Sequence, residues 1–85
     1  MNKSNANNKD GSIEELFGIV LQQLRKEKGL SQEELGFESG YHRTYISLLE
    51  RGKKSPSLKT IFKLAEALNV KPSEIIDRIQ TKMAD

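Results

Sequence analysis

Apolar side chains recur at helical spacing along most of this 85-residue chain. The first stripe of residues three or four positions apart consists of Ile13, Phe17, Val20, Leu21 and Leu24. Such a stripe predicts a helix that buries one face. Ser12 can cap this helix and Gly29 can terminate it, so we expect it to run to about Lys28. Ile19 falls off the stripe and is expected at the surface, either as an isolated apolar residue or beneath a partner subunit.

Two more apolar stripes follow in the second half of the chain. Behind a cap at Ser57, the next stripe comprises Leu58, Ile61, Phe62, Ala65 and Leu68. We expect Asn69 to end this helix, because asparagine tolerates the left-handed backbone conformation found at helix ends. Pro72 then stands in the first turn of a last helix. The apolar side of that helix consists of Ile75, Ile76 and Ile79.

Between the first and second stripes, the pattern changes to two short helices joined by a tight turn. Ser31 and Glu34 have the spacing of a capping box, which predicts the start of the first short helix. Gly40 can supply the positive φ that a sharp turn needs, and Gly36 removes a side chain where the second helix must approach closely. We expect the second short helix over about residues 42–51, ended by the glycine that follows.

Five helices with short connections and no strand pattern predict a compact all-α domain. We place this domain at residues 12–80 and expect residues 81–85 to fray. Residues 1–11 contain four asparagines and no periodic pattern, which predicts a disordered N-terminal tail. The alternative is an arm that reaches into a DNA groove, for which the tail offers only the basic residues Lys3 and Lys9.

Several classes of protein are disfavoured by composition. The absence of cysteine excludes a disulfide framework and thiolate metal sites. The longest apolar run is residues 19–21, far short of the roughly 20 residues of a membrane helix, and no cleavable signal pattern opens the chain. The single histidine has no nucleophile or second histidine beside it. We therefore expect a cytoplasmic protein that contacts no membrane, binds no metal or cofactor, and is not an enzyme.

Positive charge is concentrated in one segment. Residues 41–63 carry Glu50 as their only acid against six basic side chains, namely Arg43, Arg51, Lys53, Lys54, Lys59 and Lys63. A basic segment that coincides with a short helix and the loop after it is typical of a surface that meets phosphates. The alternative for the charge alone is an ordinary solvated face.

The spacing of small and apolar residues around the turn completes a known pattern. Counting Gln32 as first, Leu35 is fourth, Gly36 fifth, Gly40 ninth, Ile46 fifteenth and Leu49 eighteenth. This resembles the helix-turn-helix of the lambda-type phage repressor and Cro family, also called the xenobiotic-response-element family. The resemblance covers roughly residues 13–76 and implies a lambda-repressor-like DNA-binding domain. Ser39 stands where the family more often has an apolar residue, and Tyr41 brings a hydroxyl after the glycine, so we expect a more hydrated turn.

The resemblance also implies which residues contact DNA. The base-contacting set in the major groove would be His42, Arg43, Thr44, Ser47 and Leu48. Arg43 could bind guanine in a bidentate fashion, worth about 1–3 kcal/mol of discrimination, while Thr44 and Leu48 could meet thymine methyl groups. The alternatives are an exposed helix face of mixed polarity and, for His42, a helix-start residue without chemistry.

A second set would contact the DNA backbone. By the same resemblance, the phosphate contacts would be Gln32, Arg51, Lys53, Lys54 and Ser55. Helix starts attract anions, which supports Gln32. Two further residues, Arg25 and Glu50, would form a partly buried ion pair that joins the first helix to the second helix of the motif.

These expectations together indicate a sequence-specific transcriptional regulator that binds double-stranded DNA at an inverted-repeat operator as a homodimer. The predicted dimer interface is the last helix, through Ile75, Ile76 and Ile79. The alternative is an antitoxin or a restriction-modification controller protein whose main partner is another protein or RNA polymerase. In some family members, acidic residues of the first motif helix touch RNA polymerase. Glu33 could therefore make such a contact, or could serve capping and solubility alone.

Overall fold

A computed structural model describes residues 11–84, which contain five α-helices and no strand. The helices are α1 (Ile13–Glu27), α2 (Gln32–Ser39), α3 (Arg43–Glu50), α4 (Leu58–Leu68) and α5 (Pro72–Ala84). The predicted all-α fold is confirmed. Apart from Gly11, the predicted disordered tail lies outside the described residues.

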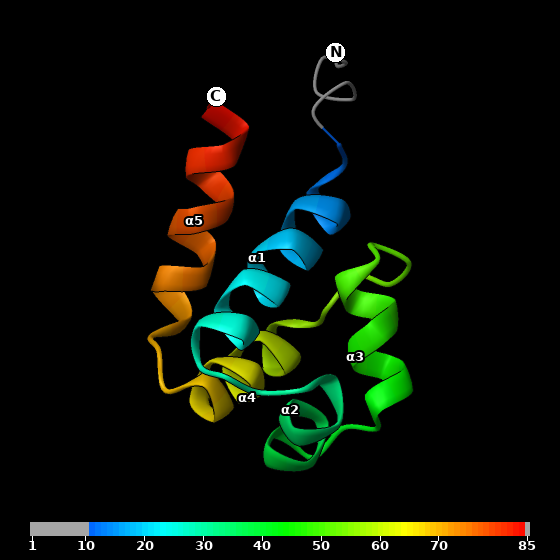
Figure 1. The fold of residues 1–85 in the computed structure, drawn as a ribbon. Coiled ribbons are helices and arrows are strands. Elements are labelled where there is room, and N and C mark those ends of the chain that lie inside the picture. The colour runs from blue at the N-terminus through cyan, green and yellow to red at the C-terminus, as the bar shows by residue number, and fades with distance from the viewer. Residues whose placement is uncertain (1–10, 85) are drawn as a thin grey trace.

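The helix α1 occupies the middle of the arrangement (Figure 1). It contacts α3 on one side and α5 on the other, while α2 packs against both α3 and α4. The chain runs in opposite directions in α1 and α5, which lie side by side. None of the helices among residues 11–84 has the length and apolarity needed to cross a membrane.

One apolar core joins all five helices. Its buried members are Leu16, Phe17, Val20, Leu21, Leu24, Leu35, Ile46, Leu49, Leu64, Ala65, Leu68, Ile75 and Ile79. Each helix contributes one face to this core, as the spacing of apolar residues predicted. Ile19, which was expected at the surface, is 45% exposed.

Three residues that we assigned to buried stripes are exposed instead. Ile13, Leu58 and Phe62 are 57%, 72% and 55% exposed. Ile13 and Leu58 are the first residues of α1 and α4, where the chain has only just entered the helix. Phe62 lies one turn after Leu58 and shares its outward face. The buried face of α4 is formed by Thr60, Leu64, Ala65 and Leu68.

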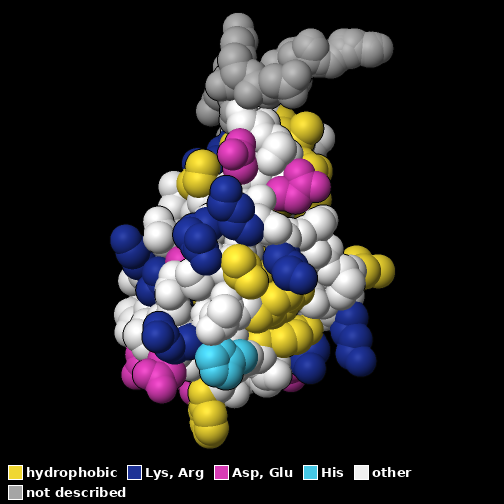
Figure 2. Space-filling model, turned by 90° about the vertical axis from the view of Figure 1, so that its right-hand side faces the viewer, with side chains coloured by type: hydrophobic (Ala, Val, Ile, Leu, Met, Phe, Trp, Pro, Cys, Tyr) yellow, Lys and Arg dark blue, Asp and Glu magenta, His cyan; other side chains and the backbone are white. Residues whose placement is uncertain are grey.

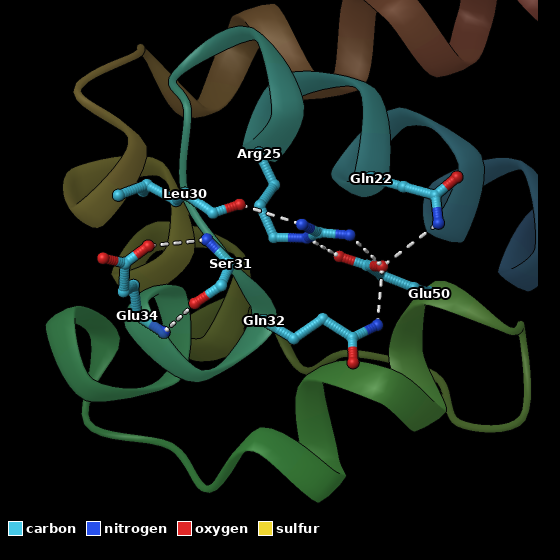
Figure 3. Close-up of polar contacts among 7 residues, drawn as sticks. All are labelled: Gln22, Arg25, Leu30, Ser31, Gln32, Glu34 and Glu50. Carbon is cyan, nitrogen blue, oxygen red and sulfur yellow. Dashed lines mark hydrogen bonds and ion pairs between the residues drawn. The ribbon is translucent and has the colours of Figure 1, made fainter.

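The helix ends follow the predicted caps. At the start of α2, Ser31 Oγ accepts a hydrogen bond from the Glu34 backbone N–H at 3.0 Å, and Glu34 Oε1 accepts one from the Ser31 N–H at 2.8 Å (Figure 3). Gly40 ends α2 with a φ of +83°, and Asn69 ends α4 with a φ of +58°. The last helix continues to Ala84, beyond the predicted boundary at residue 80.

The two residues that depart from the family pattern are satisfied by protein atoms. Ser39 is buried, and its hydroxyl donates to the carbonyl oxygen of Leu35 at 2.7 Å, inside its own helix. The Tyr41 hydroxyl lies 3.0 Å from Thr60 Oγ1 of α4. The polar atoms of the turn therefore have partners within the fold, where the sequence suggested hydration.

Two glycines allow close approach of backbone to backbone. A Cβ on Gly36 would lie 2.5 Å from the Tyr41 carbonyl oxygen, so the expected close approach at this glycine is found at the turn. A Cβ on Gly18 would lie 2.6 Å from the Leu49 carbonyl oxygen. Because α1 has no side chain at Gly18, the last turn of α3 can rest directly on it.

Candidate nucleic-acid interface

The face that the sequence predicts to contact DNA begins at the N-terminus of α3. His42 is the N-cap of this helix, and its Nδ1 accepts a hydrogen bond from the Thr44 backbone N–H at 3.0 Å. His42, Arg43 and Thr44 are all exposed. Ile46 and Leu49 point into the core and fix the rotation of the helix, so the first turn faces solvent.

One turn later along α3, the predicted base-contacting residues are less exposed to solvent. Ser47 and Leu48 are half-buried. Arg51 Nε donates to Ser47 Oγ at 3.2 Å, which holds the guanidinium along the outer face of α3. Arg43, Thr44, Ser47 and Leu48 share one sector of α3, and His42 caps its start. Of these five predicted base-contacting residues, the first three in the chain are exposed and the last two are half-buried.

A basic loop follows α3. The exposed residues Arg51, Lys53, Lys54 and Ser55 form this loop, and Gly52 turns the chain with a φ of +72°. The Lys53 backbone N–H donates to the Leu48 carbonyl oxygen at 2.9 Å, so the loop folds back onto the helix. Figure 2 shows the face that carries α3, where Lys and Arg side chains are spread over the surface above and beside the single histidine, with apolar side chains between them.

The other end of α3 is fixed to α1 by Arg25 and Glu50. Arg25 Nε donates to Glu50 Oε2 at 2.6 Å, and Arg25 Nη2 donates to Glu50 Oε1 at 3.0 Å (Figure 3). The Arg25 and Glu50 side chains are only 10% and 1% exposed. Hydrogen bonding to Glu50 raises the pKa of Arg25. A third bond, from Arg25 Nη1 to the Leu30 carbonyl oxygen at 2.8 Å, extends this attachment to the segment before α2.

Gln32 belongs to the same polar cluster. Its Nε2 donates to Glu50 Oε1 at 3.0 Å, and Gln22 Nε2 donates to the same oxygen at 3.4 Å (Figure 3). Gln32 is half-buried at the start of α2, and the hydrogen bond to Glu50 holds its amide in place. The sequence did not reveal the role of Gln22, although it lies three residues before Arg25 on neighbouring positions of α1.

A hydroxyl cluster on α4 supports the turn. Thr60 is buried, and its Oγ1 lies 3.0 Å from the Tyr41 hydroxyl, 3.5 Å from the Tyr45 hydroxyl and 3.0 Å from Ser57 Oγ. The two tyrosine rings are 5.0 Å apart, and Lys63 Nζ lies 4.9 Å from the centre of the Tyr41 ring. Sequence reasoning missed this cluster, since Thr60 looked only like a polar residue one turn after a helix cap.

Phe37 is an unexpected part of this surface. It is 86% exposed and lines a shallow depression together with Glu33, Tyr41, His42 and Arg43. The signal was present in the sequence, because Phe37 is two residues from the buried Leu35 and must therefore lie on the opposite side of α2.

The predicted dimer residues lie in different environments. Ile75 and Ile79 are 0% and 6% exposed and belong to the core of this chain, so they are not open to a partner. Ile76 is 48% exposed. The part of the predicted interface that remains accessible on α5 is therefore Ile76, joined by Met83, which is 56% exposed.

Two short helices joined by a glycine turn, with the second exposed beside a basic loop, define a helix-turn-helix DNA-binding domain. Residues 21–75 match the family model described as helix-turn-helix. The chain belongs to the Cro/C1-type helix-turn-helix family of DNA-binding transcriptional regulators.

Similar proteins include controllers of restriction-modification systems. The chain is 46% identical over 67 residues to control protein C.BamHI of Bacillus amyloliquefaciens, which covers 78% of this chain and 83% of that protein. The crystal structure of the restriction-modification controller protein C.AhdI from Aeromonas hydrophila is 48% identical, with a TM-score of 0.72 over 73% of this chain and 94% of that chain. The controller protein C.Esp1396I, solved as a tetramer with its natural 35-base-pair operator, is 26% identical, with a TM-score of 0.79 over 86% of this chain and 96% of that chain.

Proposed function

We propose that this protein is a sequence-specific regulator that binds an inverted-repeat operator as a homodimer and places α3 of each subunit in the major groove. The observation that carries the proposal is the exposed first turn of α3, with His42, Arg43 and Thr44 beside the basic loop. Arginine and threonine can read guanine and thymine edges, while Arg51, Lys53 and Lys54 neutralise phosphates on the flanking backbone.

Selection of binding sites from random duplexes tests this proposal. The wild-type chain is expected to enrich one sequence with two-fold symmetry, and Arg43→Ala is expected to lose preference at one base pair of each half-site. Lys71→Ala is the matched control, because it removes one exposed positive charge away from α3. Enrichment of no sequence would overturn the proposal, while an unaltered preference in Arg43→Ala would remove Arg43 from the readout.

The dimer uses the accessible side of α5. Ile76 and Met83 are apolar and exposed, and two-fold pairing would cover them while doubling the DNA contacts. Sedimentation of the full chain at micromolar concentration is expected to show a dimer, and Ile76→Glu is expected to shift it to monomer. A monomer in both the presence and the absence of the selected duplex would contradict this part of the proposal.

The genes under control are those of a restriction-modification system. The support is the likeness to C.BamHI and C.AhdI, which are themselves control proteins. The DNA upstream of a neighbouring endonuclease or methyltransferase gene is fused to a reporter gene. Expression of this reporter is expected to change when the protein is present. If the reporter responded only when fused to the DNA upstream of another neighbouring gene, such as a toxin gene, the antitoxin role would be favoured.

RNA polymerase is a second candidate partner, through Glu33. The observation that favours it is the exposure of Phe37 next to Glu33 on α2, which gives an acidic surface an apolar contact point. In a reporter assay, Glu33→Lys is expected to lose activation while operator binding stays intact. Equal activation by the variant and the wild type would exclude this contact.

A further inference from the structure

Two aromatic side chains on different helices are left exposed by the fold. Phe37 of α2 is 86% exposed, and Phe62 of α4 is 55% exposed. Single apolar residues are common on protein surfaces. These two differ from that ordinary case, because each ring lies on a helix face that carries charges of one sign, and the two signs are opposite.

The surface around Phe37 is acidic. At about 100° per residue, Phe37 lies between Glu33 and Glu34 on the outer side of α2, and Glu38 follows on the same side. All four residues are exposed, and α2 contains no lysine or arginine. Arg43 of α3 lines the same shallow depression as Phe37, so the negative charge belongs to α2 itself. The outer side of α2 therefore presents one aromatic ring among three carboxylates.

The surface around Phe62 is basic. Leu58 lies one turn before Phe62 and is 72% exposed, so two apolar side chains share the outward face of α4. Lys59 is exposed next to them. Residues 51–65 contain five lysines and arginines and no acid, and Glu66, the only acid of α4, lies one turn beyond Phe62. The first half of α4 therefore presents an apolar surface in positively charged surroundings.

The two surfaces cannot meet within one chain. The helices α2 and α4 pack against each other, and both turn a buried face to the core. Phe37 is two residues from the buried Leu35, so its ring points away from that core. Phe62 is likewise two residues from the buried Leu64 and points outward. Contact between the acidic and the basic surface therefore requires two copies of the chain.

We propose that the Phe37 surface of α2 docks on the Leu58 and Phe62 surface of α4 in a second copy. The partner is a second copy because the two surfaces are complementary in charge and both expose apolar side chains. The contact is head-to-tail, so each copy keeps one free surface of either kind and association continues beyond two subunits. It is separate from the α5 pairing and needs no DNA. RNA polymerase, if bound through Glu33, would use the same side of α2, so the two partners would exclude each other.

Sedimentation of the full chain tests this contact. DNA is left out, since Phe37 lies beside His42 and Arg43. With rising concentration the wild type is expected to form species larger than those at micromolar concentration, and added salt is expected to disperse them. Phe37→Ser and Phe62→Ser are each expected to weaken this growth by roughly tenfold or more, as loss of an aromatic anchor does. Ile19→Ser is the control, because it removes an apolar side chain that is 45% exposed elsewhere.

A mixture of the two variants tests the head-to-tail geometry. Phe37→Ser keeps its α4 surface, and Phe62→Ser keeps its α2 surface. An equimolar mixture is therefore expected to regain the larger species that neither variant forms by itself. Charge is tested separately: Lys59→Glu is expected to weaken the growth, whereas Lys71→Glu, at an exposed position before α5, is expected to leave it unchanged.

Three results would overturn the inference. The first is a wild type that does not grow at about 1 mM, where even a weak contact forms. The second is growth of either serine variant equal to that of the wild type. The third is a mixture of the two variants that stays as small as each variant separately, which would show that the two surfaces do not pair with each other. Selection of an operator would be unaffected by any of these results, because it depends on α3.

Discussion

Gly18 of α1 lies against the last turn of α3, so closely that a Cβ on it would come within 2.6 Å of the Leu49 carbonyl oxygen. That oxygen belongs to backbone and cannot swing aside as a flexible side chain would. Within a helix, replacing glycine by alanine normally increases stability by about 1 kcal/mol. At this position the clash should reverse the sign.

We therefore expect Gly18→Ala to lower the free energy of unfolding by about 1–3 kcal/mol, the usual cost of overpacking. Denaturant unfolding followed by circular dichroism measures it. Gln23→Ala, at an exposed position of the same helix, serves as the control and should change little. A stabilised Gly18→Ala variant would show that α1 and α3 can separate at no cost.

The buried ion pair gives a second prediction. Glu50 is 1% exposed and Arg25 10% exposed at the side chain, so removal of the carboxylate leaves a guanidinium without its partner in a dry site. Glu50→Ala is expected to cost about 3–5 kcal/mol of unfolding free energy. Glu27→Ala, which removes an exposed carboxylate from another ion pair, should cost much less. An unchanged melting temperature for Glu50→Ala would show that the pair adds nothing to the fold.

The Thr60 hydroxyl gives a third prediction, which again concerns stability. Thr60→Val preserves the shape of the side chain and removes the oxygen that Tyr41, Tyr45 and Ser57 share. We expect a loss of about 1–3 kcal/mol, because a half-buried tyrosine hydroxyl loses its partner. Combining Thr60→Val with Tyr41→Phe should cost less than the sum of the two single changes. Additive losses in this double-mutant cycle would argue that the two hydroxyls do not interact.

We expect the ion pair between Glu27 of α1 and Arg78 of α5 to contribute to the acid dependence of stability. Arg78 donates to both oxygens of Glu27, and this hydrogen bonding lowers the pKa of Glu27 below its ordinary value of 4.5. A lowered carboxylate pKa contributes stability above the ordinary value, and that contribution disappears as the pH falls through the folded-state pKa. Urea unfolding of Glu27→Gln between about pH 6 and pH 2 should show a shallower decline of stability with acid. A decline as steep as that of the wild type would assign the acid sensitivity to other carboxylates.

The salt dependence of operator binding tests the basic loop. Each neutralised phosphate contributes about −0.9 to the slope of log affinity against log salt concentration. In a homodimer, Lys53→Ala removes two such contacts, so the slope should become shallower by about 1.8. Lys54→Ala should behave alike, and Lys71→Ala should leave the slope unchanged. If both loop variants showed the same salt slope as the wild type, residues other than Lys53 and Lys54 would contact the phosphates.

The sequence was most informative where the backbone needs a particular residue type. The turn between α2 and α3 was predictable because Gly40 adopts a φ of +83° and Gly36 has no room for a Cβ. The caps at Ser12, Ser31 and Ser57 followed from the same kind of local requirement. Each of these requirements involves residues close together in the sequence, so the sequence alone can predict them.

Helical periodicity was less informative about burial, because it gives the direction of a side chain but not what covers it. Leu58 and Phe62 share a face of α4, yet that face is exposed, while Thr60 is buried against the turn. Contacts between distant segments were also hidden. Gln32 and Gln22 meet at Glu50 from positions 18 and 28 residues away, which no local spacing indicates. The exposure of the start of α3 and, through the resemblance, the Arg25–Glu50 pair were therefore predictable, whereas the two glutamines that join this pair were not.

The placement of Glu50 has an electrostatic consequence for the whole surface. Residues 41–63 contain six lysines and arginines, and Glu50 is the only acid among them. Its carboxylate is turned away from solvent and compensated by Arg25, a residue from outside the segment. From this segment, an approaching polyanion therefore meets six cations and no uncompensated carboxylate. Arg25 of α1 neutralises the buried Glu50 carboxylate. This strengthens the electrostatic attraction that the exposed side of α3 exerts on a polyanion at a distance.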